Sequence, residues 1–184
     1  MRVCILMGSL RPDRNTAELC KPFMDELLQH EAAVEYITLY DKRIAPCRGC
    51  YSCQSVVDAY GCVQQDDMQA IVESILKADV LVFATPVYTW QATPPMKAVM
   101  DRMYGLNKFY GSAPCAVLNL GQAYALIVTC GYDLDFERDY WMKVYGDGAG
   151  IPACHISECM PFATKIIWRR SKPNLPSPEQ GRLH

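Results

Sequence analysis

Residues 80–86 read Val80-Leu81-Val82-Phe83-Ala84-Thr85-Pro86, five apolar residues in a row that run into a threonine and a proline. An unbroken apolar run of this length is typical of a strand that is buried on both faces, as in a parallel sheet. Apolar residues recur at helical spacing in residues 68–76 before this run and in residues 94–103 after it. A buried strand between two amphipathic helices indicates a βαβ arrangement.

The same alternation continues along the chain. The other segments predicted to be strands are Arg2–Met7, Ala33–Leu39, Ala123–Thr129 and, more weakly, Ile151–Ile156. The first predicted helix has Asn15 or Thr16 as its N-cap, and the other predicted helices begin at Asp66, at Pro94 and at Asp135. This pattern predicts an α/β protein with a doubly wound, five-stranded parallel sheet and helices on both faces. We expect one domain over residues 1–165 and a proline-containing C-terminal tail over residues 166–184.

Composition limits the classes of function. With 184 residues, 51% of them hydrophobic and 21% charged, the chain fits one globular domain. Its net charge of −2 gives no sign of a nucleic-acid or anionic-membrane partner. The apolar run at the N-terminus stops at Gly8, too short for a secretory segment of about 7–15 apolar residues or a membrane span of about 20. We therefore expect a cytoplasmic protein.

The segment between the first strand and the first helix, Gly8–Thr16, combines groups that bind anions. A helix N-terminus presents unpaired backbone N–H groups and the positive end of the helix dipole. Hydroxyl, amide and guanidinium donors occupy the same segment, at Ser9, Arg11, Arg14, Asn15 and Thr16. The segment has neither a Walker A lysine sequence nor GxGxxG, so it favours neither ATP nor a Rossmann-bound dinucleotide. It predicts a phosphate site, although a capped helix with surface arginines would have a similar composition.

A second candidate binding segment, Thr85–Pro95, follows the buried strand. It carries Tyr88 and Trp90, whose flat rings can stack on a flat heterocycle. Its prolines stiffen it and so reduce the entropy lost on binding. The alternative is that both aromatic residues simply cap the core. Ligands of parallel sheets bind at the carboxyl ends of the strands, which favours the binding interpretation.

Four of the ten cysteines stand close together as Cys47-x2-Cys50-x2-Cys53-x8-Cys62. Three thiolates at this spacing can surround one small centre, and the fourth can close it from beyond a turn at Gly61. Structural zinc more often uses two separated pairs, whereas tightly spaced triplets are typical of iron–sulfur ligation. The spacing leaves three interpretations open: a cluster, free thiols or a disulfide, and zinc. A disulfide would be unusual in a reducing cytoplasm.

Three separated segments carry a resemblance to a known family. Gly8-Ser9-x-Arg11-x-x-x-Asn15-Thr16 resembles the FMN-phosphate loop of the NADPH-dependent FMN reductase and flavodoxin-like superfamily. Thr85-Pro86-Val87-Tyr88, followed by Pro95-x-Lys97 and Asp101-Arg102, is similar to that family's second signature. Thr129-Cys130-Gly131 falls where its third flavin loop begins. The resemblance implies a flavodoxin-like fold and bound FMN.

From this resemblance we expect two groups of residues to bind FMN. The phosphate would be held by Ser9, Arg11, Arg14, Asn15 and Thr16. The isoalloxazine ring would be held by Pro86, Val87, Tyr88, Thr89, Trp90, Cys130 and Gly131. We identify no residue that must act as a general acid or base, whereas Lys97 and Asp101 are expected to form a pair on a helix surface.

The cysteine motif narrows the resemblance to the iron–sulfur flavoproteins, a branch of the same superfamily with a compact cysteine motif after the second strand. That resemblance implies a [4Fe–4S] cluster on Cys47, Cys50, Cys53 and Cys62, in a cysteine-rich loop over residues 46–62. The chain departs from the branch in its last cysteine gap, which is longer.

The resulting hypothesis is an FMN-dependent NAD(P)H oxidoreductase that passes electrons from a reduced donor to a small-molecule or protein acceptor. We expect it to form a homodimer or homotetramer. Two alternatives stay open: an electron-transfer flavoprotein that turns over no substrate, and a non-redox protein with a structural zinc in the cysteine loop.

Overall fold

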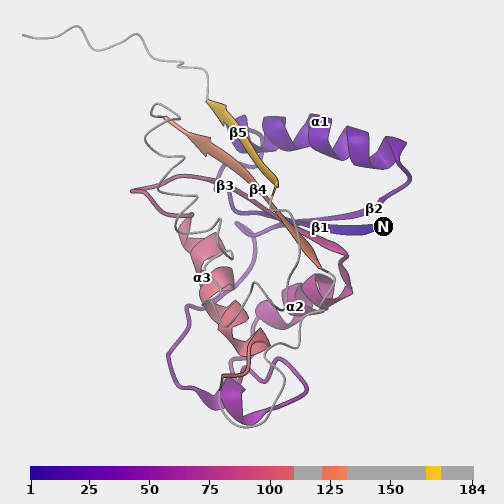
Figure 1. Ribbon diagram of the computed structural model, residues 1–184. Coiled ribbons are helices and arrows are strands. Elements are labelled where there is room, and N and C mark those ends of the chain that lie inside the picture. Colours follow the sequence, from indigo (N-terminus) through magenta and orange to yellow (C-terminus); the bar gives the residue numbers. More distant parts are fainter. Residues whose placement is uncertain (110–121, 132–164, 171–184) are drawn as a thin grey trace, which may run out of the picture.

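The computed structural model describes residues 1–109, 122–131 and 165–170, and its centre is one parallel sheet (Figure 1). The strands are β1 (Arg2–Met7), β2 (Ala33–Thr38), β3 (Val80–Pro86), β4 (Ala123–Cys130) and β5 (Lys165–Arg170). They pair in the order β2-β1-β3-β4-β5, and every pairing is parallel. This is the strand order of flavodoxin-like doubly wound folds. The predicted fold class is confirmed.

Along the chain, the described helices alternate with the strands. They are α1 (Asn15–Gln29), α2 (Met68–Lys77) and α3 (Pro94–Arg102), with two short 3₁₀ turns at η1 (Ser52–Ser55) and η2 (Met103–Leu106). Two prolines open α3, as expected for residues whose missing N–H needs no partner in the first turn. The cap of α1 is Arg14 rather than the predicted Asn15 or Thr16, because the helical conformation already begins at Asn15.

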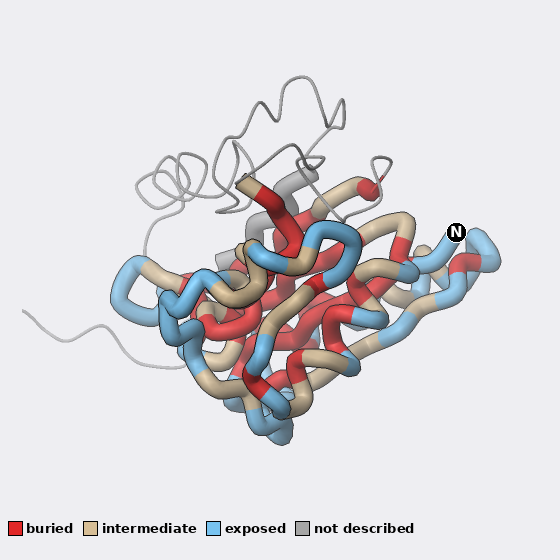
Figure 2. Tube along the Cα trace, turned by 90° about the horizontal axis from the view of Figure 1, so that it is seen from below, coloured by how far each residue is buried: buried red, intermediate tan, exposed pale blue. Residues whose placement is uncertain are grey.

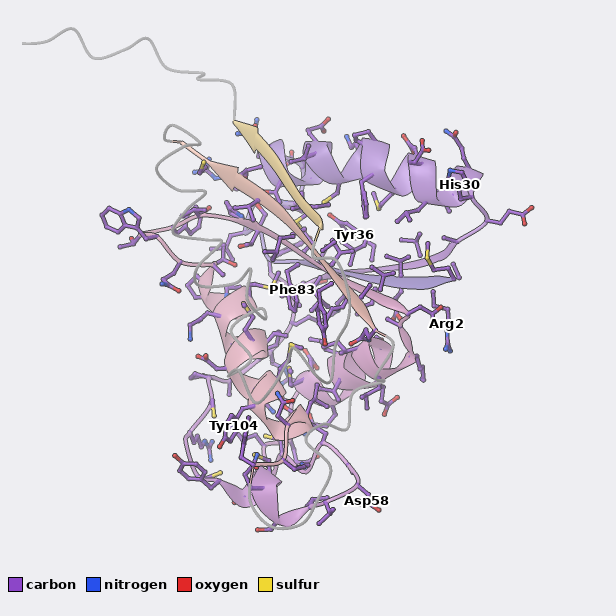
Figure 3. The ribbon with its side chains drawn as sticks, in the orientation of Figure 1. Arg2, His30, Tyr36, Asp58, Phe83 and Tyr104 are labelled. Atoms are coloured by element: carbon purple, nitrogen blue, oxygen red, sulfur yellow. The ribbon has the colours of Figure 1, made fainter. Side chains whose placement is uncertain are left out.

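Alternate residues of each central strand face opposite layers, which explains the unbroken apolar runs. Val3 and Ile5 of β1 belong to a core with α1, whereas Cys4 and Leu6 belong to a core with α2 and α3. In Figure 1 α1 lies on one face of the sheet, and α2 and α3 lie on the other. Figure 2 shows the buried segments gathered inside and the exposed segments around them. Phe83, in the second core, stacks on Tyr124 (Figure 3).

The fifth strand differs from the prediction. It is formed by Lys165–Arg170, which pairs with β4 and crosses the expected boundary between domain and tail at residue 165. Residues 166–170 of the expected tail thus lie in this strand. A parallel edge strand is held by backbone pairing. This strand ends in two arginines, so its sequence lacks the long apolar run that identified the central strands. The predicted strand Ile151–Ile156 and the predicted helix Asp135–Tyr145 lie outside the described residues.

None of the helices in the described ranges is long and apolar enough to span a membrane.

The two-layer core predicts a clear contrast between two leucines. Leu81 on β3 is fully buried, whereas Leu28 on α1 is 59% exposed. We expect Leu81→Ala to lower the free energy of unfolding by about 2–5 kcal/mol, because it leaves a cavity in close-packed surroundings. Leu28→Ala should change that free energy by no more than about 0.5 kcal/mol. Urea unfolding followed by circular dichroism measures both, and equal effects would contradict the burial of β3.

Candidate functional site

The carboxyl ends of β1, β3 and β4 meet at one edge of the sheet. Met7 pairs with Ala84, and Ala84 pairs with Ile127, so the three strands run in register. Beyond their ends the backbone pairing continues, because Gly8 N–H donates to the carbonyl of Ala84 at 2.8 Å and Val87 N–H donates to that of Thr129 at 2.8 Å. The three segments that the sequence analysis singled out therefore begin side by side.

Buried threonines tie these segments together. The hydroxyl groups of Thr16 on α1 and Thr129 on β4 form a hydrogen bond of 2.7 Å. Thr93, which is fully buried at the start of α3, donates its hydroxyl to the carbonyl of Gly8. Its backbone N–H donates to the hydroxyl of Thr85 at 3.3 Å. Sequence reasoning gave a binding role to Thr16 and named Thr85 and Thr129 only as parts of motifs. It did not single out Thr93, because a buried threonine leaves no local pattern.

The predicted phosphate segment is organised around the start of α1. Ser9 is buried, and its hydroxyl bonds the backbone N–H and carbonyl of Arg11 at 3.1 and 2.9 Å, which shapes the turn. The side chains of Arg11, Arg14 and Asn15 are exposed. The first N–H groups of α1 belong to Asn15, Thr16 and Ala17 and have no partner within the helix. These amides and exposed side chains can hold an anion, whereas the Ser9 and Thr16 hydroxyls already have partners in the protein.

The second predicted segment forms a tight hairpin turn. Tyr88 and Gln91 exchange two backbone hydrogen bonds of 2.9 and 3.0 Å, and the two residues between them, Thr89 and Trp90, have φ of 49° and 61°. Two successive non-glycine residues in the left-handed region cost on the order of 1–3 kcal/mol each, a strain that clusters at ligand-binding segments. Tyr88 is 41% and Trp90 53% exposed, so the alternative that both cap the core is wrong.

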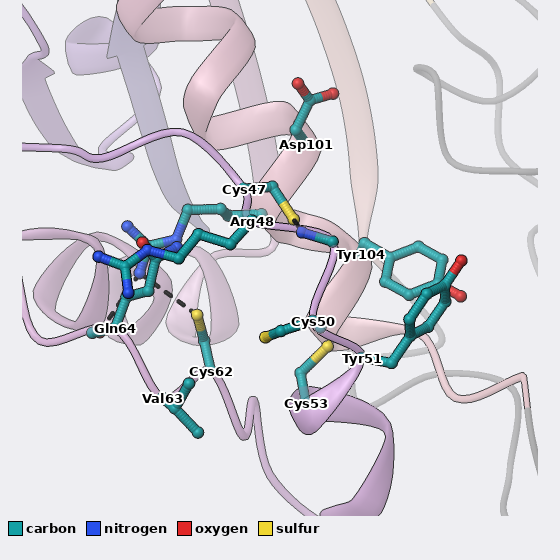
Figure 4. Close-up of a pocket in the computed structure, with 13 residues that line it drawn as sticks. Cys47, Arg48, Cys50, Tyr51, Cys53, Cys62, Val63, Gln64, Asp101 and Tyr104 are labelled. Carbon is teal, nitrogen blue, oxygen red and sulfur yellow. Dashed lines mark hydrogen bonds between the residues drawn. The ribbon is translucent and has the colours of Figure 1, made fainter.

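The four cysteines of the predicted motif line one pocket of about 350 Å³ (Figure 4). The pocket lies between the cysteine loop and the end of α3, where Arg102, Tyr104 and Gly105 complete its wall. All four thiols are free, and Cys47 and Cys50 are exposed. No three thiol, imidazole or carboxylate groups among the described residues converge tightly enough to hold a single metal ion.

Hydrogen-bond donors surround these sulfurs. Arg102 Nη2 lies 3.4 Å from Cys62 Sγ, Gly49 N–H donates to Cys47 Sγ at 3.5 Å, and Gln54 Nε2 lies 3.7 Å from Cys53 Sγ. Such donors stabilise a thiolate over a thiol.

The protonation of two of the thiols follows from these contacts. Partial burial disfavours the thiolate of Cys62, but hydrogen bonds from the Gln64 backbone and from Arg102 outweigh it, so the pKa is lowered. Hydrogen bonds from Ser52 lower the pKa of Cys50.

A buried ion pair closes the neck of the cysteine loop. Arg102, at the end of α3, is 2% exposed and pairs with Asp66, while also donating to the carbonyls of Ala45 and Gln64. It thus joins the residues that enter the loop to those that leave it. The loop then turns at Gly61, whose φ of 70° and whose close contact with Val56 both require glycine. The predicted turn before Cys62 is confirmed.

The same loop is docked on the segment after α3. Gln54 donates to the carbonyls of Tyr104 and Asn107, and it accepts from the backbone N–H of Phe109 at 3.0 Å. Burial lowers the pKa of Lys108, whose ammonium group lies under the loop. On the exposed side of α3, Lys97 and Asp101 form the predicted surface pair.

Comparison with known proteins agrees with this geometry. The family model for NADPH-dependent FMN reductases matches residues 1–127. The chain belongs to this family. The matched residues include the predicted phosphate segment, the Tyr88–Gln91 turn and all four clustered cysteines. Membership supports FMN binding and an FMN-dependent oxidoreductase activity, as the resemblance in the sequence implied.

Curated relatives of this FMN reductase family member are named iron–sulfur flavoproteins. One from Methanocaldococcus jannaschii is 31% identical over 102 residues, which cover 55% of this chain and 51% of the relative. One from Archaeoglobus fulgidus is 31% identical over 128 residues, which cover 66% of this chain and 57% of the relative. The chain thus matches between half and three-fifths of the length of these relatives.

Solved structures show the same fold at low sequence identity. The NAD(P)H:quinone oxidoreductase from Methanothermobacter marburgensis superposes with a TM-score of 0.68 at 18% identity, covering 96% of this chain and 87% of that one. An FMN-dependent NADH-azoreductase from Bacillus anthracis, solved with FMN, gives a TM-score of 0.56 at 16% identity, covering 92% and 85%. At these identities the likeness shows the fold alone.

The threonine contacts predict that Thr93 couples the phosphate segment to the start of α3. We expect Thr93→Val, which keeps the shape but leaves the Gly8 carbonyl without its donor, to lower the free energy of unfolding by about 1–3 kcal/mol and to weaken FMN binding. Thr93→Ser, which keeps the hydroxyl, is the matched control. Urea unfolding and flavin fluorescence titration measure the two effects, and equal behaviour of the two variants would contradict this role.

The buried thiols and the thiols of the cysteine loop should differ in the pH at which they are alkylated. Burial raises the pKa of Cys4 and of Cys20 to about 12, whereas the pKa values of Cys50 and Cys62 are lowered. Because only the thiolate is alkylated, we expect iodoacetamide to label Cys50 and Cys62 of the metal-free protein below pH 8 and to spare Cys4 and Cys20. Peptide mass spectrometry reads the labels. Unfolded protein should label all four, and labelling of Cys4 or Cys20 in the folded protein would contradict the assignment.

Proposed function

We propose that this chain is an FMN-dependent oxidoreductase that accepts electrons from NAD(P)H and passes them to a small-molecule or protein acceptor. The observation that carries the proposal is the meeting of three segments at the carboxyl edge of the sheet, within the residues matched by the FMN reductase family. That edge is where ligands of doubly wound folds bind. When bound, FMN supplies the redox chemistry, and the protein supplies position and electrostatics.

The residues present fit FMN. The first amides of α1, with Arg11, Arg14 and Asn15, would hold its phosphate, since they combine unpaired N–H groups with exposed positive charge. The strained turn at Thr89 and Trp90 would lie along the ring, with the half-buried Pro86 and Val87 beneath it. The Thr16–Thr129 and Thr93–Gly8 hydrogen bonds keep the two parts of this site together before the ligand arrives.

We further propose that the pocket lined by Cys47, Cys50, Cys53 and Cys62 holds a [4Fe–4S] cluster. Support comes from four free thiols around one pocket, N–H donors to three of them, and relatives named iron–sulfur flavoproteins. A cluster binds each thiolate at a different iron, so the sulfurs need not converge on one point as they must around zinc. The spread of the thiols around the pocket wall therefore favours the cluster over zinc.

Helix α3 connects the two proposed sites. Its first turn follows Thr93, which bonds Gly8 beside the proposed flavin site, and its last residue, Arg102, bonds Cys62. Nine helical residues span roughly 13 Å, so one rigid helix sets the separation of the two redox groups. An electron carrier without a substrate of its own is the second candidate, because a cluster beside a flavin also suits that role.

The proposed function predicts a defined spectrum and a defined reaction. Protein purified without oxygen should show flavin bands with a broad iron–sulfur shoulder, near-stoichiometric iron and sulfide, and bleaching of the flavin on addition of NADH or NADPH. Cys53→Ser should lose the shoulder and retain the flavin bands, because Cys53 lies at the other end of α3 from the flavin segments.

Each result separates the candidates. Flavin without iron would leave an FMN reductase and overturn the cluster, and zinc in place of iron would favour the structural metal. A flavin that NAD(P)H does not bleach would favour the electron carrier. A protein that binds no FMN would overturn the proposal. Size-exclusion chromatography with light scattering on the same sample tests the predicted dimer or tetramer.

A further inference from the structure

Lys108 is a buried cation whose environment the flavin chemistry does not explain. Its side chain belongs to a residue that is only 4% exposed. Its ammonium group donates to the carbonyls of Gly105 at 2.7 Å, Cys53 at 2.8 Å and Tyr60 at 3.5 Å. Two of these carbonyls belong to the cysteine loop, so the charge of Lys108 lies directly beneath the loop that carries the thiols.

No carboxylate in the described part of the chain lies within ion-pair distance of Lys108. Arg102, a buried cation that lines the cysteine pocket, is neutralised by Asp66. Lysine is almost never fully buried without a partner, because removal of a charge from water is costly. The carbonyl groups satisfy the three N–H donors of Lys108, but they do not cancel its charge.

The position of Lys108 is fixed by backbone packing. Gly105, one turn before it, approaches the cysteine loop so closely that an added Cβ would lie 2.8 Å from the carbonyl oxygen of Tyr60. The Gln54 hydrogen bonds to Tyr104 and Asn107 hold the same two segments together. The cation is therefore placed under the loop by contacts that need no metal.

We propose that Lys108 is the counter-charge of the anionic group that the four thiolates bind, and that it sets the reduction potential of that group. The inference rests on the proposed cluster. A cluster held by four thiolates is an anion in both oxidation states, and one-electron reduction adds a further negative charge. A fixed cation nearby stabilises the reduced state more than the oxidised state, so it raises the potential.

Arg102 and Lys108 act on this group in different ways. Arg102 donates a hydrogen bond to Cys62 Sγ, but its charge is shared with Asp66. Within the described residues the ammonium of Lys108 hydrogen-bonds carbonyl oxygens and no sulfur, so it would contribute through its charge. Lys108 is thus a residue that can be changed without the removal of a contact to a thiol.

The test is a redox titration of the cluster in wild-type protein and in Lys108 variants, followed by absorption and electron paramagnetic resonance with dithionite as reductant. We expect Lys108→Met and Lys108→Gln to shift the midpoint potential of the cluster to more negative values, and Lys108→Arg to keep it near that of the wild type. Lys77→Met is the matched control, because Lys77 lies exposed on α2 away from the pocket. The flavin potential of each variant serves as an internal reference.

Asp58→Asn gives a second, independent change. Asp58 is an exposed residue of the same loop (Figure 3). Its negative charge opposes the positive charge of Lys108. Its removal should therefore raise the cluster potential at low ionic strength, where exposed charges are least screened. This variant keeps the test decisive if the Lys108 variants do not fold.

The outcomes distinguish this inference from the function on which it rests. Wild-type protein that contains no iron overturns the cluster and, with it, the role of Lys108. An unshifted potential in cluster-containing Lys108→Met overturns the role of Lys108 but does not contradict the proposed cluster. If the Lys108 variants do not fold, an unshifted cluster potential in cluster-containing Asp58→Asn overturns the role of Lys108. A shift in Lys108→Arg as large as that in Lys108→Met would also overturn it, since the charge would then not be the cause.

Discussion

The parallel register of β1, β3 and β4 is the constraint on which the candidate site depends. Because Met7, Ala84 and Ile127 stand side by side, three segments far apart in the chain start from one edge of the sheet. The buried threonines then connect these segments through hydrogen bonds that water cannot compete for. The proposed flavin site would therefore be largely formed before any ligand binds, which reduces the entropy lost on binding.

A second centre is built on the far end of α3 by a different principle. The cysteine loop has little regular structure, and buried charges hold it instead: Arg102 at its neck and Lys108 beneath it. Buried charges are weak sources of net stability, but they specify one arrangement when every partner is in place. The loop is therefore fixed to the same helix that begins at the proposed flavin edge, and α3 sets the geometry between the two proposed sites.

Sequence reasoning succeeded where one short segment carries the whole signal. The apolar runs of β1, β3 and β4 gave the layer structure because burial on both faces removes alternation. The edge strand Lys165–Arg170 gave no such signal, and its residues 166–170 were placed in the expected tail. Ser9 stays a predicted phosphate ligand, and the structure adds that its hydroxyl bonds the backbone of Arg11. The identity of a donor can be read from a sequence, but its partner cannot.

The amino-acid sequence by itself determined the α/β class, the cysteine motif and the resemblance to FMN reductases, and it predicted an anion site at the start of α1. Each of these depends on residues that are neighbours along the chain. Tertiary structure alone decided that Thr93 bonds Gly8, that Arg102 reaches Cys62 and that Lys108 lies under the thiol loop. Those contacts join residues 40 to 85 positions apart. Their formation depends on how the sheet and helices pack, and no local pattern of residues encodes it.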